Sequence, residues 1–503
     1  MGMIDGLDNL TASLRWQLLD VQTEPEALLE AMFAEEEPAI LESSATHPDF
    51  GRYTILAVRP VEVLTLREGI LTNRRGNVLA KGDTEFWSAL GKAFGAVSIA
   101  KADRPAPYVP GWIGYVGYEV GRLVERLPGG ARRDTRLPDL RLAFYDALLV
   151  YDALQRRWWL AELKFDRHVE RTGQAGDALR RLVVAVKEPQ ADPLSPPARP
   201  AGWTAAPSEA RANFSNEQYR RAVRRCIDYI AAGDVFQVNL SQRFVIEDAP
   251  APEAIYRALR RRNPSWHGAF LRFESAGQTC AVLSSSPELF LRRRGDCVLT
   301  RPIKGTRRRT GDDDADGAAA AELLASAKDN AELAMIIDLL RNDLGRVCRY
   351  GSVEVVEPRR LEAHPTVFHL TGAIRGRLQD GVGIADLLRA CFPGGSITGA
   401  PKIRAMEIID ELEGLARGVY TGCIGIVGVD GNCEWNIAIR TIVCDADRAL
   451  AQVGGGIVAD SDPQAEYVET LDKARALLEA VAQARAGGAA ERAGTSMAEA
   501  GRR

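Results

Sequence analysis

Two pairs of acidic residues have the spacing that places both carboxylates on one face of a helix. Asp329 and Glu332 are three positions apart, and Glu466 and Glu469 repeat this spacing near the C-terminus. Converging carboxylate oxygens suit a hard cation such as Mg²⁺, which is typically held by one or two protein carboxylates, several waters and an anionic substrate. The alternative is that both pairs belong to solvated helix faces, and spacing alone does not decide between the two.

Glycine-rich segments indicate where the backbone could approach an anion. Segment 393–402 (PGGSITGAPK) runs straight into a predicted helix, and glycines 454–456 end a predicted strand. Glycine lets backbone N–H groups approach a carboxylate or phosphate, and a helix N-terminus adds partial positive charge. The spacing of a P-loop is absent and no G-x-G-x-x-G follows a strand, so nucleotide binding is disfavoured. A turn followed by a helix cap is the alternative interpretation.

Four single residues could act on a bound anion. Arg440 interrupts an apolar strand and would need a counter-anion if buried, from a substrate or from the protein. Lys304, at a strand end beside Ile303, could become nucleophilic through a lowered pKa. Glu288, in the same predicted hairpin, could be a general acid or base, and His369 lies in an alternating strand-like stretch. Solvated side chains, or a core histidine for His369, are the alternatives.

Composition excludes several classes of protein. The chain has 503 residues, is 46% hydrophobic and 26% charged, and carries a net charge of −4, as expected for a globular protein of two to four domains. It has no basic footprint for nucleic acid, no apolar run long enough to span a membrane, and no export signal at its start. The eight cysteines are scattered without a C-x-x-C pair, which predicts reduced thiols and a cytoplasmic location.

The candidate residues must be positioned by a mixture of helices and hairpins. Asp430-Gly431 between apolar runs 421–429 and 434–443 predicts a hairpin, as does 294–296 between 289–291 and 298–303. Hairpins imply antiparallel sheet, so the predicted fold class is α+β. Apolar periodicity predicts helices over 25–33, 166–186, 216–232, 319–347, 401–415 and 463–484.

The chain divides into four predicted regions. Residues 1–188 form a β-rich N-terminal domain, and the proline-rich segment 189–212 is a linker. Residues 213–484 carry the candidate site and form the second domain. Residues 485–503, mostly Ala, Gly, Glu and Arg without apolar periodicity, are expected to form a disordered tail.

Taken in order, these segments resemble the chorismate-utilising enzymes, the family of anthranilate synthase component I, aminodeoxychorismate synthase component I, and the isochorismate and salicylate synthases. The match runs from about residue 214 to 480, with a looser match at 41–43 and 111–115. Its motifs are 233–242 (GDVFQVNLSQ), 286–288 (SPE), 302–306 (PIKGT), 328–332 (KDNAE), 338–345 (DLLRNDLG), the segment around His369, 393–402, 420–422 (YTG), 436–441 and 454–469.

The resemblance implies a fold and a site. The expected fold has two large antiparallel β-sheets packed face to face as a sandwich with helices outside, part of the N-terminal domain completing the sheets. Glu332 and Glu469 would bind Mg²⁺ directly, with Asp329 and Glu466 acting through water. The other implied site residues are Lys304, Glu288 and His369 for catalysis, and Gln237, Thr398, Gly399, Tyr420, Arg440, Gly455 and Gly456 for binding chorismate.

Two positions separate the reactions of the family. Isochorismate and salicylate synthases carry a water-activating lysine where this chain has Gln237. Anthranilate synthases resemble P-I-A-G-T where this chain has Lys304, and a lysine there is the mark of aminodeoxychorismate synthase component I. Its amine would attack C2 of chorismate and displace the C4 hydroxyl, after which ammonia enters at C4. Asn239 points the same way, whereas Leu333 departs from a histidine frequent in the family.

The resemblance also implies partners. The nearest match to a glutaminase elbow, 422–425, lacks the required spacing, and no histidine follows His369, so ammonia should come from a separate glutamine amidotransferase subunit. The product would be 4-amino-4-deoxychorismate, a precursor of 4-aminobenzoate and folate. The alternatives are anthranilate synthase component I and a non-catalytic regulatory subunit. Residues 41–43 resemble the start of a tryptophan pocket, and whether tryptophan binds stays open.

Overall fold

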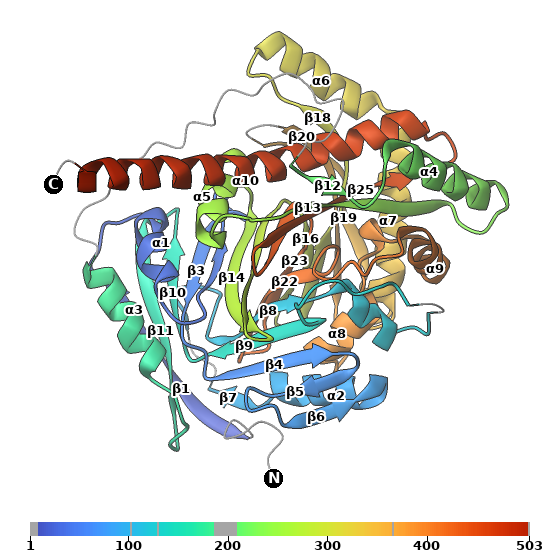
Figure 1. The fold of residues 1–503 in the computed structure, drawn as a ribbon. Coiled ribbons are helices and arrows are strands. Elements are labelled where there is room, and N and C mark those ends of the chain that lie inside the picture. The colour runs from blue at the N-terminus through green and yellow to red at the C-terminus, as the bar shows by residue number, and fades with distance from the viewer. Residues whose placement is uncertain (1–8, 101–102, 128–129, 186–208, 365–366, 501–503) are drawn as a thin grey trace.

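The computed structural model describes residues 9–100, 103–127, 130–185, 209–364 and 367–500 (Figure 1). The helices are α1 (Pro25–Phe33), α2 (Gly82–Phe94), α3 (Gln174–Ala185), α4 (Asn216–Ala231), α5 (Pro252–Arg262), α6 (Asp313–Ala325), α7 (Ala327–Gly345), α8 (Ile384–Cys391), α9 (Lys402–Glu413) and α10 (Pro463–Ala500), with 3₁₀ turns η1 (Tyr118–Leu123) and η2 (Gly395–Ile397). No helix in this part of the chain is long and apolar enough to cross a membrane.

The described strands form two large sheets. The first runs, in spatial order, β12 (Arg211–Ala212), β13 (Gln237–Ile246), β25 (Arg448–Ile457), β24 (Thr441–Asp445), β15 (Gln278–Ser286), β14 (His267–Ser275), β2 (Ala39–Glu42), β3 (Tyr53–Ala57), β10 (Ala147–Asp152), β11 (Arg157–Phe165), β1 (Leu10–Leu19) and β7 (Val97–Ile99), with β21 (Gly399–Ala400) beside β13. The second runs β18 (Ile303–Arg308), β20 (Val367–Arg377), β17 (Cys297–Arg301), β16 (Leu289–Arg294), β23 (Cys433–Ile437), β22 (Cys423–Gly428), β8 (Gly111–Val116), β9 (Leu140–Tyr145), β4 (Glu62–Arg67), β5 (Ile70–Thr72) and β6 (Val78–Lys81), with β19 (Glu354–Ala363) beside β20.

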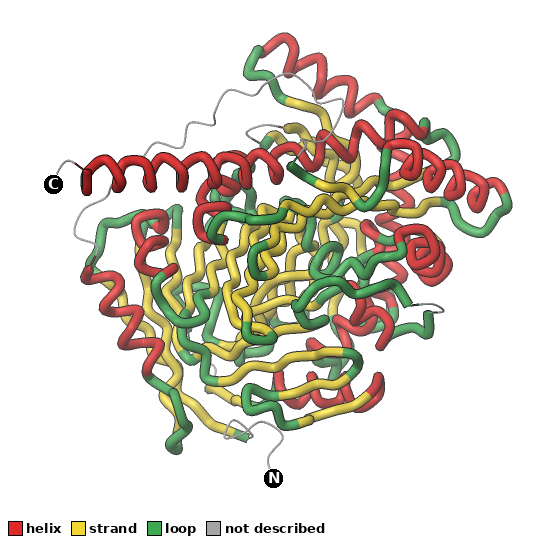
Figure 2. Tube along the Cα trace, in the orientation of Figure 1, coloured by secondary structure: helices red, strands yellow, loops and turns green. Residues whose placement is uncertain are grey.

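The two sheets pack face to face, and the helices cover their outer faces (Figure 2). One apolar layer lies between the sheets, and each outer face has its own apolar layer under helices. Side chains alternate between these layers, because successive residues of a strand point to opposite faces. In β14, for example, Leu271 lies in the layer between the sheets and Phe270 lies under the helices. The predicted α+β sandwich is therefore confirmed.

Both halves of the chain contribute to both sheets. β2 pairs with β14 in the first sheet, and β8 pairs with β22 in the second. The predicted boundary between an N-terminal and a second domain is thus not a boundary between sheets. Most of the predicted linker falls in residues 186–208, which lie outside the described residues, and its end forms β12.

Several predicted elements differ from those observed. The apolar run 434–443 is two strands, β23 and β24, which belong to different sheets. The helix predicted over 319–347 is broken at Ser326, whose hydroxyl caps α7 by accepting from the N–H of Asp329 at 3.2 Å. α3 begins only at Gln174, eight residues after the predicted start. α10 continues to Ala500, so its backbone is helical through most of the predicted disordered tail, where strong helix formers are frequent.

The hairpin predicted at Asp430-Gly431 is confirmed and joins β22 to β23. In β22, Gly425 lies so close to β23 that a Cβ would overlap the backbone carbonyl of Glu434. We predict that Gly425→Ala lowers the free energy of unfolding by about 1–3 kcal/mol, the usual effect of overpacking. Gly345→Ala, at the end of α7 where a Cβ meets open space, is the matched control and should be neutral. Urea denaturation measures both, and equal stability of the two variants contradicts the prediction.

Candidate active site

A cleft of about 640 Å³ lies where strands of both sheets meet α7 and α10. This volume is in the range of small-molecule sites. Most of the residues predicted from the sequence line it, although they are distant along the chain. These are Glu288, Lys304, Asp329, Glu332, His369, Tyr420, Arg440, Gly455, Gly456, Glu466 and Glu469.

Three predicted binding residues lie behind the wall of the cleft instead. In the β13–β21 pairing Gln237 lies opposite Ala400 and Gly399 lies opposite Val238, whereas Thr398 is fully buried and accepts the N–H of Asn239 on its backbone carbonyl at 2.8 Å. Ser396 and Ile397 line the cleft at this point. Within the segment 393–402, Ser396 and Ile397 therefore face the cavity, whereas Thr398 and Gly399 do not line it.

A β-bulge aims Lys304 into the cleft. β18 and β20 shift register between Lys304 and Thr306, and the intervening Gly305 has φ +67°, which favours glycine. The shift leaves Lys304 opposite Leu370, and Thr306 opposite His369. Thr306 Oγ1 is hydrogen bonded to His369 Nδ1 at 3.0 Å.

Ser396 joins the lysine to a buried carboxyl group. Lys304 Nζ donates to the backbone carbonyl of Ser396 at 3.0 Å, and Ser396 Oγ donates to Glu288 Oε1 at 2.7 Å. Burial raises the pKa of Glu288 to about 7. Burial lowers the pKa of Lys304, against the opposing effect of the carboxylates of Glu332 and Glu288. The site therefore holds an acid with a raised pKa close to an amine with a lowered pKa.

The four carboxylates of the predicted metal site face the same cleft from two helices. Burial raises the pKa of Glu332 and of Glu466, whereas the ammonium group of Lys473 lowers that of Glu469. Lys473 Nζ contacts Glu469 Oε1 at 2.7 Å and donates to the carbonyl of Gly454 at 2.9 Å. Asp329 pairs with Arg307 at 3.1 Å.

The donor chemistry of this cluster fits a hard cation. Only carboxylate oxygens are offered, the ligand type that Mg²⁺ prefers over the nitrogen and sulfur ligands of zinc. In the described part of the chain, no group of three or more acidic, histidine or cysteine side chains is close enough to enclose a metal. In this structure Glu469 is paired with Lys473 and Asp329 is paired with Arg307.

Arg440 and Tyr420 come from strained backbone. Arg440 has φ +52°, and Thr421, next to Tyr420, has φ +60°. Left-handed conformations of residues other than glycine cost free energy and cluster at functional sites. Arg440 donates from NH1 to the carbonyl of Lys473 at 2.8 Å, and the guanidinium of Arg417 lies 5.7 Å from the centre of the Tyr420 ring.

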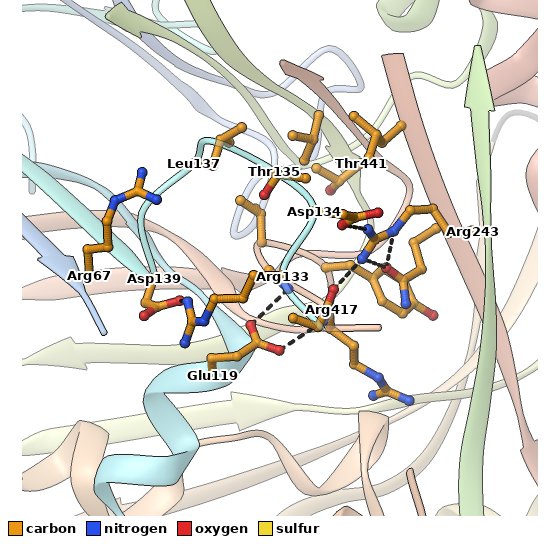
Figure 3. A pocket seen from close by; sticks show the side chains of 17 residues that line it. Arg67, Glu119, Arg133, Asp134, Thr135, Leu137, Asp139, Arg243, Arg417 and Thr441 are labelled. Carbon is orange, nitrogen blue, oxygen red and sulfur yellow. Dashed lines mark hydrogen bonds and ion pairs between the residues drawn. The ribbon is translucent and has the colours of Figure 1, made fainter. Parts of the chain in front are cut away.

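Two smaller hollows accompany the cleft, and the first shares Tyr420 and Gln452 with it. One of about 40 Å³, enough for about three waters, is bounded by paired charges such as Arg243 and Asp134 (Figure 3). There Glu119 accepts the N–H groups of Arg417 and Gly418, both at 2.8 Å, and so fixes the loop that leads to Tyr420. The other, of about 50 Å³, adjoins the 41–43 segment, where Tyr108, Trp266 and Glu434 contribute to its lining. Neither has the volume of the cleft.

Sequence reasoning missed Ser396 and Lys473. Lys473 follows Glu469 by four positions on α10, so the helical period places both on one face and could have revealed it. The link from Ser396 to Lys304 goes through a backbone carbonyl, for which side-chain motifs give no signal. Asn239, which the sequence motif 233–242 contains, also lines the cleft. Its Oδ1 is buried without a hydrogen-bond partner among the described residues.

Comparison with known proteins identifies the family of this chain. The model of the chorismate binding enzyme family matches residues 38–479. Anthranilate synthase component 1 1 of Haloarcula marismortui is 40% identical over 393 residues, covering 77% of this chain and 78% of that protein. Aminodeoxychorismate synthase component 1 of Klebsiella aerogenes is 38% identical over 440 residues, covering 87% and 92%. The crystal structure of anthranilate synthase component I from Streptococcus pneumoniae superposes with a TM-score of 0.70 at 31% identity, covering 86% and 93%. The chain therefore belongs to the family of chorismate binding enzymes.

Proposed function

We propose that this chain is an aminodeoxychorismate synthase component I, which converts chorismate and ammonia to 4-amino-4-deoxychorismate. The observation that carries the proposal is the amine of Lys304, which faces the cleft with a lowered pKa beside a carboxyl group with a raised pKa. A neutral amine is a nucleophile and a protonated carboxyl is a proton donor. The homologue from Klebsiella aerogenes carries the same name.

The reaction would proceed in two displacements. Lys304 Nζ attacks C2 of the ring, both ring double bonds shift, and the C4–O bond breaks as Glu288 gives its proton to the leaving hydroxyl, which departs as water. Ammonia then attacks C4, both double bonds shift back, the C2–N bond breaks to release Lys304 as a neutral amine, and the new ammonium group at C4 returns a proton to Glu288. Two successive allylic displacements thus place nitrogen at C4.

The remaining cleft residues would bind and orient the substrate. Arg440 and Tyr420 bind the enolpyruvyl carboxylate, and Gly455 and Gly456 line the cleft beside it. His369 orients the leaving hydroxyl. Burial lowers the pKa of His369 to about 3, so its ring is neutral and acts by hydrogen bonding. Gln237, Thr398 and Gly399 support the wall from behind.

Mg²⁺ would be held by Glu332 and Glu469 directly, with Asp329 and Glu466 acting through water. When bound, the ion supplies positive charge for the ring carboxylate of chorismate. In this structure Lys473 forms an ion pair with Glu469. With Mg²⁺ bound to Glu469, Lys473 would contact the substrate or solvent instead.

Ammonia would come from a glutamine amidotransferase subunit. Cys423, the nearest candidate for a glutaminase nucleophile in this chain, is fully buried in β22, and burial raises its pKa well above the usual value. A buried thiol of this kind is inert. The product would then feed the synthesis of 4-aminobenzoate and folate.

The second candidate is anthranilate synthase component I, because the relative from Haloarcula marismortui has that name. It would use the same carboxylates and the same Arg440, but it would need no nucleophilic lysine.

Identification of the product separates the two candidate functions. With chorismate, Mg²⁺ and excess ammonium salt, the chain should yield 4-aminobenzoate only after an aminodeoxychorismate lyase is added. Lys304→Ala and Lys304→Arg should abolish this product, because neither side chain supplies a nucleophilic amine. Chromatography of the aminobenzoates measures it. Formation of 2-aminobenzoate without the lyase, or full activity of Lys304→Ala, would overturn the proposal.

The second prediction concerns pH at a constant concentration of free ammonia. Glu288 must be protonated, so the rate should fall above about pH 7 as Glu288 ionises. Lys304 must be neutral, and because burial lowers its pKa, its amine should stay reactive at a lower pH than that of an exposed lysine. Glu288→Gln should lower kcat by about 10²–10⁴-fold and remove the alkaline limb. Persistence of that limb in Glu288→Gln would contradict the role of Glu288.

The third prediction concerns the metal. EDTA should abolish turnover and Mg²⁺ should restore it, and Glu469→Gln should raise the Mg²⁺ concentration needed for half-maximal rate. Titration of Mg²⁺ into the EDTA-treated protein and its variant gives both values. Turnover that persists in EDTA would refute the assigned ligands.

A further inference from the structure

A row of aromatic rings, each packed against the next, ends at His369. The ring of His364 packs against His369 with centroids 5.0 Å apart and planes at 71°. On its other side, His364 packs on Trp266 at 4.3 Å, and Trp266 packs on His47 at 4.6 Å and on Phe50 at 6.0 Å. The row thus begins in the loop after β2, near the N-terminus, and ends in the cleft.

One ion pair, one cation–π contact and a closed loop hold the row in place. The guanidinium of Arg301 lies 3.8 Å from the centre of the Phe50 ring and forms a buried ion pair with Glu362, two residues before His364. The loop that carries Phe50 is closed by reciprocal backbone hydrogen bonds between His47 and Gly51, at 3.1 and 3.0 Å.

His364 contacts His369 through its ring. Burial lowers the pKa of His364, and its Nε2 has no hydrogen-bond partner among the described residues, with the Glu362 carboxylate 3.9 Å away. Nδ1 of the His369 ring is hydrogen bonded to Thr306. The rings that pack against His369 limit rotation of the ring about this hydrogen bond. A neutral ring that acts by hydrogen bonding must present its nitrogen in a defined direction.

We infer that His364 and Trp266 are positioning residues for the reaction: they hold the ring of His369 against Thr306, and the loop of His47 and Phe50 braces them from the N-terminal region. This inference rests on the proposed function for its kinetic test. It assigns a role to His364, which lines the cleft next to His369, and to Trp266, which is not among the lining residues.

A double-mutant cycle tests the inference. His364→Ala and Trp266→Leu should lower kcat severalfold with little change in the KM for chorismate, and His364→Phe and Trp266→Phe should recover most of the loss because they restore a ring. In a His369→Gln background, His364→Ala should have no further effect on kcat, because it acts through the ring that is gone. Trp158→Leu, which removes an equally buried tryptophan outside the cleft, is the matched control for lost stability and should leave kcat unchanged.

A spectroscopic measurement makes the test independent of turnover. The chain has only five histidines, so ¹⁵N-histidine spectra can be assigned with one substitution each. His364→Ala should shift and broaden the His369 ring nitrogens, and His364→Phe should restore them. Unchanged His369 signals, or additive losses of kcat in the cycle, would overturn the inference. If the parent chain consumes no chorismate, the proposed function fails, and the spectra still decide the positioning role.

Discussion

The passage of the chain from one sheet to the other, between β23 and β24, is the constraint on which the site depends. Facing sheets are about 10 Å apart, and residues 438–440 make this crossing, as residues 287–288 do between β15 and β16. Within the crossing Arg440 has a left-handed conformation, and neighbouring segments bind to the crossing through the backbone. Ile437 donates to the carbonyl of Glu288 at 3.0 Å, and Thr421 donates to Ala438 at 2.8 Å. One crossing therefore places the acid, the arginine and the tyrosine loop around the same cleft.

Electrostatic balance is the second organising feature of the cleft. Carboxylates from α7 and α10 share the cleft with Lys304, Lys473 and Arg440, and Glu288 and Glu466 among its acids are buried. A low-dielectric environment strengthens each of these interactions and makes any unpaired charge costly. A substrate with two carboxylates, accompanied by a divalent cation, would complete this balance. The cleft is thus suited to a dianion in a way that an apolar pocket is not.

Local patterns predicted the parts of the fold that local physics decides. The Asp430-Gly431 turn and the amphipathic α4 could be predicted because turn chemistry and helical period act over a few residues. The switch of sheets at 438–440 could not, since an apolar run has the same pattern whether one sheet or two receive it. For the same reason Thr398 and Gly399 could not be assigned to the wall or to the space behind it, because β21 is placed by its pairing with β13.

The choice between the two amination reactions depends on one side chain, because relatives with both names are similarly close in sequence. A lysine buried in this cleft carries a desolvation cost, which an alanine or a leucine would avoid. Lys304 meets that cost with a hydrogen bond to a backbone carbonyl and with nearby carboxylates, at the end of a bulge that points it toward the acid Glu288. A residue that only filled space would need none of these. The bulge directs the amine of Lys304 into the cleft, and the carbonyl of Ser396 holds it near the carboxyl group of Glu288. This arrangement suits an amine that attacks a substrate, and it is the physical ground for favouring amination at C4.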